Sequence, residues 1–282
     1  MNYLVTGATG GFGQLALGFL KDLVPQENIF ALARSQEKAE KLTTEGFKVR
    51  IADYSVAEKM NAALKDIDAL LFVSGAPGNR QEEHENVVNA AKANDISFIA
   101  YTSFADVDHS TSALAADHLF TEKTIKASGI PHTFLRNNWY LENELPLAGA
   151  ALAGGKFVYA AENGKTGWAL KREYAEVAAK AVATREFPEV LELSGTPVSY
   201  GELAQDLKEA TGKDIEVIAG SDQAFIENLV TNGLPQSVAE MFLTFQHDIK
   251  NGQLDVTSDD FAQALGRPLA SRVDGLKELL QG

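Results

Sequence analysis

The sequence has 282 residues, a length that suits an α/β protein with one main sheet and a smaller second lobe. Its formal net charge of -14 opposes binding to nucleic acid and to anionic membrane surfaces, although acidity also serves solubility alone. The absence of cysteine excludes disulfides, thiolate catalysis and cysteine-ligated metals. We expect a cytoplasmic protein, because a strand-like run starts almost at once and no apolar run is long enough to span a membrane.

The first half of the chain alternates short apolar runs with amphipathic segments. The apolar runs at 3–6, 29–33, 48–51, 69–73, 98–102 and 133–135 predict strands. Apolar residues at three- and four-residue spacing predict helices over 12–24, 36–45, 56–64, 82–93 and 113–128. This alternation is typical of an α/β fold with a doubly wound parallel sheet of the Rossmann type, covered by helices on both faces.

The pattern changes after about residue 139. A long connection leads to a predicted strand at 156–160, a helix at 172–183, a strand at 190–193, a helix at 200–211 and a strand at 215–218. The remainder is predicted to be mostly helical. We therefore predict two domains, a Rossmann domain over 1–145 and a smaller α/β lobe over 146–282, with some chain crossing back.

A glycine-rich loop joins the first predicted strand to the first predicted helix, and it reads Gly7-Ala8-Thr9-Gly10-Gly11-Phe12-Gly13. In this setting Gly7 permits a tight turn, Gly10 lets the backbone approach a pyrophosphate, and Gly13 allows close packing of helix on strand. Unpaired N–H groups and the positive end of the helix dipole then favour the diphosphate of a dinucleotide. The alternative interpretation is a tight turn that holds no ligand.

The end of the second predicted strand bears on the choice of dinucleotide. NAD-binding proteins usually carry an acidic residue there, which accepts a hydrogen bond from the ribose 2′-hydroxyl. This sequence has Arg34 instead, with no acidic residue before Glu37. A guanidinium is a planar donor suited to a 2′-phosphate, so we predict NADPH rather than NADH. A solvated arginine at a helix start is the alternative.

Later strand ends supply further candidate contacts, because ligands bind at the carboxyl edge of open α/β sheets. Asp53 is placed to meet the adenine, and Ser74, Gly75 and Ala76 would pass beside the ribose and pyrophosphate. The five histidines lack the spacing of metal ligands, so we predict no metal site. His84, set among three glutamates, is typical of a solvated helix face.

The catalytic signature of short-chain dehydrogenases is missing. No tyrosine is followed four residues later by lysine, so the Tyr-x-x-x-Lys pair that protonates an alkoxide is absent. Ser103, just past the fifth strand, matches the serine of those enzymes, and His118 could donate a proton near neutral pH. The alternative for His118 is a structural histidine. The protein is therefore either catalytically silent or a reductase of acceptors that need little acid catalysis, such as quinones.

The sequence resembles the NmrA-like group of atypical short-chain dehydrogenases/reductases, most specifically in the stretch from Leu135 to Asn143. The glycine loop, Arg34 and His118 also match. The resemblance implies that the nicotinamide half of the cofactor lies along Asn138, Trp139, Tyr140, Leu141, Glu142 and Asn143, with Lys171 approaching the same region. Tyr140 joins Ser103 and His118 as a catalytic candidate. Asn138 stands where quinone-reducing members often have glycine.

The resemblance implies an NADPH-dependent oxidoreductase that reduces quinones or similar flat conjugated acceptors by direct hydride transfer. Aromatic side chains suit a small planar acceptor, although core packing explains them equally well; the candidates are Phe104, Trp139, Tyr140, Phe157 and Trp168. The alternative function is a non-catalytic, NADP(H)-sensing regulator that binds a partner protein. The sequence leaves homodimer formation and the natural acceptor open.

Overall fold

The computed structural model describes residues 1–281 and divides the chain into two compact units. Unit 1 comprises Met1–Asn137 and Arg172–Glu192, and unit 2 comprises Asn138–Lys171 and the residues from Leu193 onward. The predicted boundary after residue 145 differs from this division, because one helix and most of one strand return to the sheet of unit 1. The prediction that residues 1–145 form the Rossmann domain and residues 146–282 a smaller lobe stays a prediction.

Unit 1 is built on a seven-stranded sheet with the order β3-β2-β1-β4-β5-β6-β9. Its strands are β1 (Tyr3–Val5), β2 (Ile29–Ala33), β3 (Lys48–Ile51), β4 (Ala69–Phe72), β5 (Phe98–Phe104), β6 (His132–Asn137) and β9 (Val190–Leu193). The pairs from β3 to β6 are all parallel. The predicted Rossmann-type α/β fold is confirmed, and the order reverses at β1 and β4, where such sheets bind their ligands.

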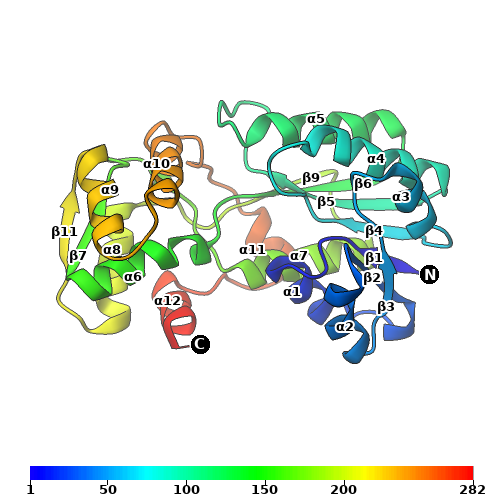
Figure 1. Cartoon of the computed structure of the whole chain (residues 1–282), viewed down its shortest axis with the longest axis horizontal. Helices are drawn as coiled ribbons and strands as arrows, with labels where there is room; N and C mark the ends of the chain where they lie inside the picture. Colours follow the sequence, from blue (N-terminus) through cyan, green and yellow to red (C-terminus); the bar gives the residue numbers. More distant parts are fainter. Residues whose placement is uncertain (282) are drawn as a thin grey trace. The chain divides into compact units, whose positions relative to one another are not determined.

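Helices cover both faces of this sheet (Figure 1). The helices are α1 (Gly11–Leu20), α2 (Gln36–Thr44), α3 (Ala57–Ala63), α4 (Arg80–Ala93), α5 (Ala115–Ser128) and α7 (Lys171–Thr184), with a 3-10 turn η1 (Gln26–Asn28). Figure 1 shows α3, α4 and α5 over one face and α1, α2 and α7 over the other. Strands β1 and β4 are buried along their whole length, which is why they read as continuous apolar runs.

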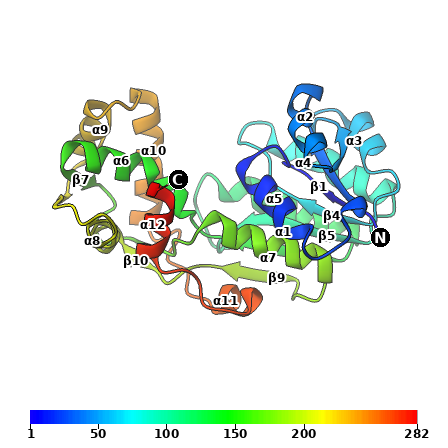
Figure 2. The ribbon, with the colours of Figure 1, turned by 90° about the horizontal axis from the view of Figure 1, so that it is seen from below.

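Unit 2 contains two short sheets surrounded by helices. Its strands are β7 (Lys156–Tyr159) parallel to β11 (Glu216–Ala219), and β8 (Lys165–Thr166) antiparallel to β10 (Val198–Ser199). Its helices are η2 (Leu141–Glu144), α6 (Leu145–Gly154), α8 (Tyr200–Thr211), α9 (Asp222–Thr231), α10 (Gln236–Lys250), α11 (Asp260–Leu265) and α12 (Arg272–Gln281). Helix α12 packs against α8 (Figure 2). Strands β8 and β10 were not predicted from the sequence, because two residues are too few to show a period.

Helix α8 shows how local sequence sets an element of unit 2. The Ser199 hydroxyl accepts from the backbone N–H of Glu202, and the Glu202 carboxylate accepts from the backbone N–H of Ser199. This reciprocal cap satisfies two donors that a helix start otherwise leaves unpaired. Gly212 ends the helix with a φ of 66°, a left-handed conformation that glycine adopts without strain. Within residues 1–281, no helix has the length and apolar composition of a membrane span.

Candidate functional site

The glycine loop of unit 1 folds as a tight connection between β1 and α1. Gly7 has a φ of 60°, and its carbonyl accepts a hydrogen bond of 2.9 Å from the N–H of Gly10. A β-carbon at Gly13 would lie 2.3 Å from that same carbonyl oxygen, closer than any real contact. Helix α1 therefore reaches its position against the loop only because residue 13 has no side chain.

The N-terminus of α1 has the character of an anion site. Gly10 occupies the N-cap position and has no side chain that could cap the helix. The first turn contains no acidic residue. A helix start with a glycine N-cap and no acidic residue in its first turn fits a pyrophosphate, because nothing negative competes there for the positive end of the helix dipole.

The loop after β4 is fixed by hydroxyl groups on neighbouring strands. The backbone N–H of Val73 donates to the Thr6 hydroxyl at 2.9 Å, and that of Ser74 donates to the Thr102 hydroxyl at 2.8 Å. Thr6 follows β1 and Thr102 lies in β5. The predicted contact residues Ser74, Gly75 and Ala76 therefore begin on a backbone that both flanking strands hold, beside the glycine loop.

Arg34 and Asp53 lie near one another at the ends of β2 and β3. Ser55 donates its hydroxyl and its backbone N–H to Asp53 at 2.7 and 3.0 Å. These bonds, with a smaller contribution from the charge of Arg34, hold the pKa of Asp53 below its usual value. Arg34 is exposed, and no hydrogen bond within residues 1–281 engages its guanidinium. The group is therefore available to a phosphate.

His84 lies in the core, so its assignment to a solvated helix face was wrong. It shares a stripe of α4 with Val87, Val88 and Ala91, and this spacing turns it inward. Its Nε2 accepts from the backbone N–H of Gly75 at 2.9 Å, which leaves Nδ1 to donate to the Thr121 hydroxyl at 2.8 Å. Burial is the main cause that lowers its pKa to about 3, so the ring is neutral and supports the β4 loop.

His118 is buried in α5 beneath the same end of the sheet. Its Nδ1 lies 2.9 Å from the Tyr101 hydroxyl, and its ring stacks on that of Phe104 with centroids 6.0 Å apart. Burial lowers the pKa of His118 to about 3, with smaller contributions from Arg80 and His84. The imidazole is therefore neutral at pH 7, and the charged proton donor suggested by the sequence is not available there. Its catalytic role stays a prediction.

Ser103 belongs to a buried polar cluster rather than to an open surface. Its hydroxyl donates to Glu122 at 2.6 Å, and Arg136 binds the same carboxylate through Nε at 3.0 Å and Nη2 at 2.8 Å. Arg136 also pairs with Asp108 and Glu192. This network joins β5, α5 and β6, so the geometry gives Ser103 a structural partner, and its catalytic role stays a prediction.

Arg80 is a candidate functional residue that was not predicted from the sequence. Its side chain is 5% exposed, its Nε donates to the Gly75 carbonyl at 2.9 Å, and its Nη1 has no partner within residues 1–281. The sequence feature that points to Arg80 is its position at the start of α4, where the positive end of the helix dipole makes a cation unfavourable.

In unit 2, the side chain of Asn138 is engaged internally. Its amide nitrogen donates to the Ser194 hydroxyl and to the Leu254 carbonyl, both at 3.0 Å. Its amide oxygen accepts from the Thr166 hydroxyl, also at 3.0 Å. Asn138 is 5% exposed, so its side chain does not project outward. Its amide instead connects three segments of unit 2 by hydrogen bonds.

The remaining candidates of this segment gather near Lys171. Both carboxylate oxygens of Glu142 accept from the backbone N–H of Lys171, at 3.0 and 2.9 Å, and so cap the start of α7. The ammonium of Lys171 lies 5.5 Å from the centre of the Tyr140 ring. A bridge between Tyr140 and Ala169 aligns the two stretches of chain. The structure thus brings Tyr140, Glu142 and Lys171 together, and their contact with the nicotinamide stays a prediction.

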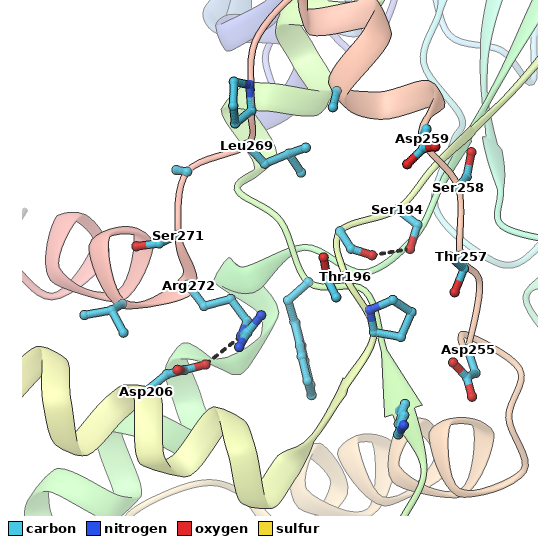
Figure 3. A pocket seen from close by; sticks show the side chains of 18 residues that line it. Ser194, Thr196, Asp206, Asp255, Thr257, Ser258, Asp259, Leu269, Ser271 and Arg272 are labelled. Carbon is cyan, nitrogen blue, oxygen red and sulfur yellow. Dashed lines mark hydrogen bonds and ion pairs between the residues drawn. The ribbon is translucent and has the colours of Figure 1, made fainter.

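Unit 2 also contains a cavity of about 650 Å³, shown in Figure 3. Trp168 lines it together with residues after β9, before α11 and before α12. Its charged residues include Asp206 and Arg272, which pair with each other (Figure 3). Of the predicted aromatic walls, only Trp168 lines this cavity, whereas Phe157 is buried near Tyr200 in the core.

Comparison with known proteins gives matches over nearly the whole chain. Residues 7–186 match the NAD(P)H-binding family. Quinone oxidoreductase 2 of Escherichia coli is 36% identical over 98% of this chain and 97% of that protein. A crystal structure of an E. coli NADPH-dependent quinone oxidoreductase complexed with NADPH has a TM-score of 0.91 at 36% identity and 99% coverage of each chain. Triphenylmethane reductase from Citrobacter sp. has a TM-score of 0.94 at 32% identity, with both chains fully covered.

Proposed function

This chain belongs to the NAD(P)H-binding family, and we propose that it is an NADPH-dependent oxidoreductase that reduces quinones or similar flat conjugated acceptors. The observation that carries the proposal is the 36% identity to a quinone oxidoreductase over 98% of the chain. The aligned region includes the residues of unit 2 as well as the dinucleotide fold of unit 1. The alternative of a non-catalytic NADP(H) sensor finds no support in the relatives named above.

The chain's own residues fit the cofactor. We infer that the amides of the loop Gly7 to Gly13 hold the pyrophosphate, because the N-cap residue Gly10 has no side chain and the first turn of α1 has no acidic residue. Ser74, Gly75 and Ala76 continue the binding edge at β4, and Arg34 selects the 2′-phosphate. When bound, the reduced nicotinamide supplies the hydride.

The acceptor chemistry agrees with the state of His118 and Ser103, the two catalytic candidates of unit 1. Hydride addition to a quinone places negative charge on a phenolate-type oxygen, which water can protonate. His118 is neutral and Ser103 is bonded to Glu122, so neither offers the acid chemistry that an alkoxide product requires. We infer that these residues position β5 and α5, and that the rate enhancement comes from the orientation of the nicotinamide and the acceptor.

Turnover of NADPH with a panel of benzoquinones and naphthoquinones tests the proposal. We expect quinone-dependent loss of NADPH absorbance, with NADH a much poorer donor, and no loss when either protein or quinone is omitted. Tight NADPH binding without turnover on any quinone or dye would move the assignment to the sensor. Failure to bind NADPH would remove the basis for both functions.

A further inference from the structure

A carboxylate with an unusual set of partners lies at the end of η2. Glu144 is 3% exposed, and a single oxygen, Oε1, accepts three hydrogen bonds. The donors are the indole N–H of Trp139 at 3.0 Å, the indole N–H of Trp168 at 3.1 Å and the hydroxyl of Tyr200 at 3.0 Å. All three donors are neutral, whereas a buried carboxylate is ordinarily paired with a cation.

The three donors come from different parts of unit 2. Trp139 follows β6, Trp168 follows β8, and Tyr200 opens α8. Backbone bonds align the first two segments, since the Leu141 N–H donates to the Ala169 carbonyl at 2.8 Å and the Ala169 N–H donates to the Trp139 carbonyl at 3.3 Å. Glu144 thus holds the side chains of two segments whose backbones run side by side.

These two segments carry the candidate cofactor residues of unit 2. The first is residues 138–143, and the second leads from Thr166 to Lys171, whose backbone N–H is bound by Glu142. Trp168 also lines the cavity of Figure 3. We propose that Glu144 is a positioning residue of this reductase, which holds Trp139, Trp168 and Tyr200 through one oxygen and thereby keeps the two segments in their working arrangement. The expected effect on turnover rests on the proposed function, whereas the positioning of the two segments does not.

The charge of Glu144 provides a way to recognise this role. Burial raises the pKa of Glu144 to about 7, against the opposing effect of its three hydrogen bonds, so its charge changes near neutral pH. Tyr200, the titratable group that touches it, has a pKa well above 10 and stays neutral. The chain and helices around it also carry the ionisable side chains of Glu142, Lys171, Asp206, Arg272, Asp274, Lys277 and Glu278, and the shift of the Glu144 pKa is set by burial and the three hydrogen bonds.

Tryptophan fluorescence reports on this cluster alone. The chain contains two tryptophans, and both donate to Glu144. We expect the emission of the wild-type protein to change through a single transition with a midpoint near pH 7. Glu144→Gln keeps the shape and an acceptor oxygen but cannot ionise, so its emission should stay at the low-pH value of the wild type across the range.

A second variant separates positioning from charge. Glu144→Leu removes the acceptor and leaves three buried donors unpaired. We expect its emission to shift at every pH and kcat/KM for NADPH and quinone to fall at least about tenfold, because small misplacements of binding residues are costly. Glu144→Gln should retain kcat/KM within about threefold and lose the wild-type pH dependence near 7.

Leu229→Ala in α9 is the matched control, since it also truncates a buried side chain of unit 2 but removes no bond to Glu144. It should unfold at lower temperature and keep the wild-type emission, the pH transition of that emission and the wild-type kcat/KM. The proposal is overturned if Glu144→Gln retains the pH transition, if the wild type shows none, or if Glu144→Leu matches Leu229→Ala in both emission and kcat/KM. The emission results decide the role of Glu144 even if no quinone is turned over, so failure of the proposed function is recognised separately.

Discussion

Replacing Gly13 by alanine tests the geometry on which cofactor binding depends. The added β-carbon would lie 2.3 Å from the Gly7 oxygen and 2.8 Å from the Ala8 α-carbon, both backbone atoms that cannot rotate away. An ordinary carbon–oxygen contact needs roughly 3.4 Å, so α1 and the loop must separate by about 1 Å. That shift moves the helix N-terminus away from any bound pyrophosphate.

The magnitude follows from the bonds at that N-terminus. Each amide bond to a charged oxygen contributes about 1.5–3 kcal/mol, so the loss of two weakens NADPH binding by roughly 3 kcal/mol or more. This corresponds to an increase of more than about a hundredfold in Kd. The measurement is a titration with NADPH, with circular dichroism to show that the variant is folded.

Gly18→Ala is the control, because Gly18 lies in the same helix and its added β-carbon meets no atom within 4 Å. We expect its Kd to equal that of the wild type and its stability to rise by up to about 1 kcal/mol. A folded Gly13→Ala protein that binds NADPH as tightly as Gly18→Ala would refute the reasoning.

Three further predictions concern charged side chains. Arg34→Ala should weaken NADPH binding about tenfold or more and leave NADH binding nearly unchanged, because only NADPH carries the 2′-phosphate; equal losses in parallel titrations would contradict the role of Arg34. Glu122→Gln should lower the free energy of unfolding by about 3 kcal/mol in a denaturant titration, since it breaks a buried ion pair with Arg136; a change below about 1 kcal/mol would show that Asp108 and Glu192 hold Arg136 unaided. The raised pKa of Glu144 means that the folded state binds its proton more tightly than the unfolded state, so wild-type stability should fall relative to Glu144→Gln as pH rises from 4.5 to about 7. The difference should reach roughly 3 kcal/mol and stay constant above pH 7, and a stability difference between the two proteins that does not vary with pH would argue against it.

The fold of unit 1 was predictable because its signals are local. Buried parallel strands are short apolar runs, and the glycine loop is a contiguous stretch between a strand and a helix. The family was predictable for the same reason, since the stretch from Leu135 to Asn143 is continuous in sequence. The strands at 156–160 and 215–218 were also found, as β7 and β11.

Burial of polar side chains was not predictable. His84 stands among glutamates, and this local charge concealed that its face of α4 packs on the sheet. His118 and Ser103 were identified by position, but Tyr101 and Glu122, which bind them, occupy neighbouring elements of the folded chain. A pKa depends on such surroundings, so the neutral state of His118 could not be inferred from its residue type.

The amino-acid sequence by itself determined the doubly wound sheet, the glycine loop and the arginine at the end of β2, because each depends on residues adjacent in the chain. Tertiary structure alone decided which polar groups meet in the interior. Glu144 is the clearest instance, since its donors at positions 139, 168 and 200 converge only after α8 and the segments around β8 have packed together. Hydrogen bonding and desolvation act over a few ångströms of space, and separation along the chain does not reveal those distances.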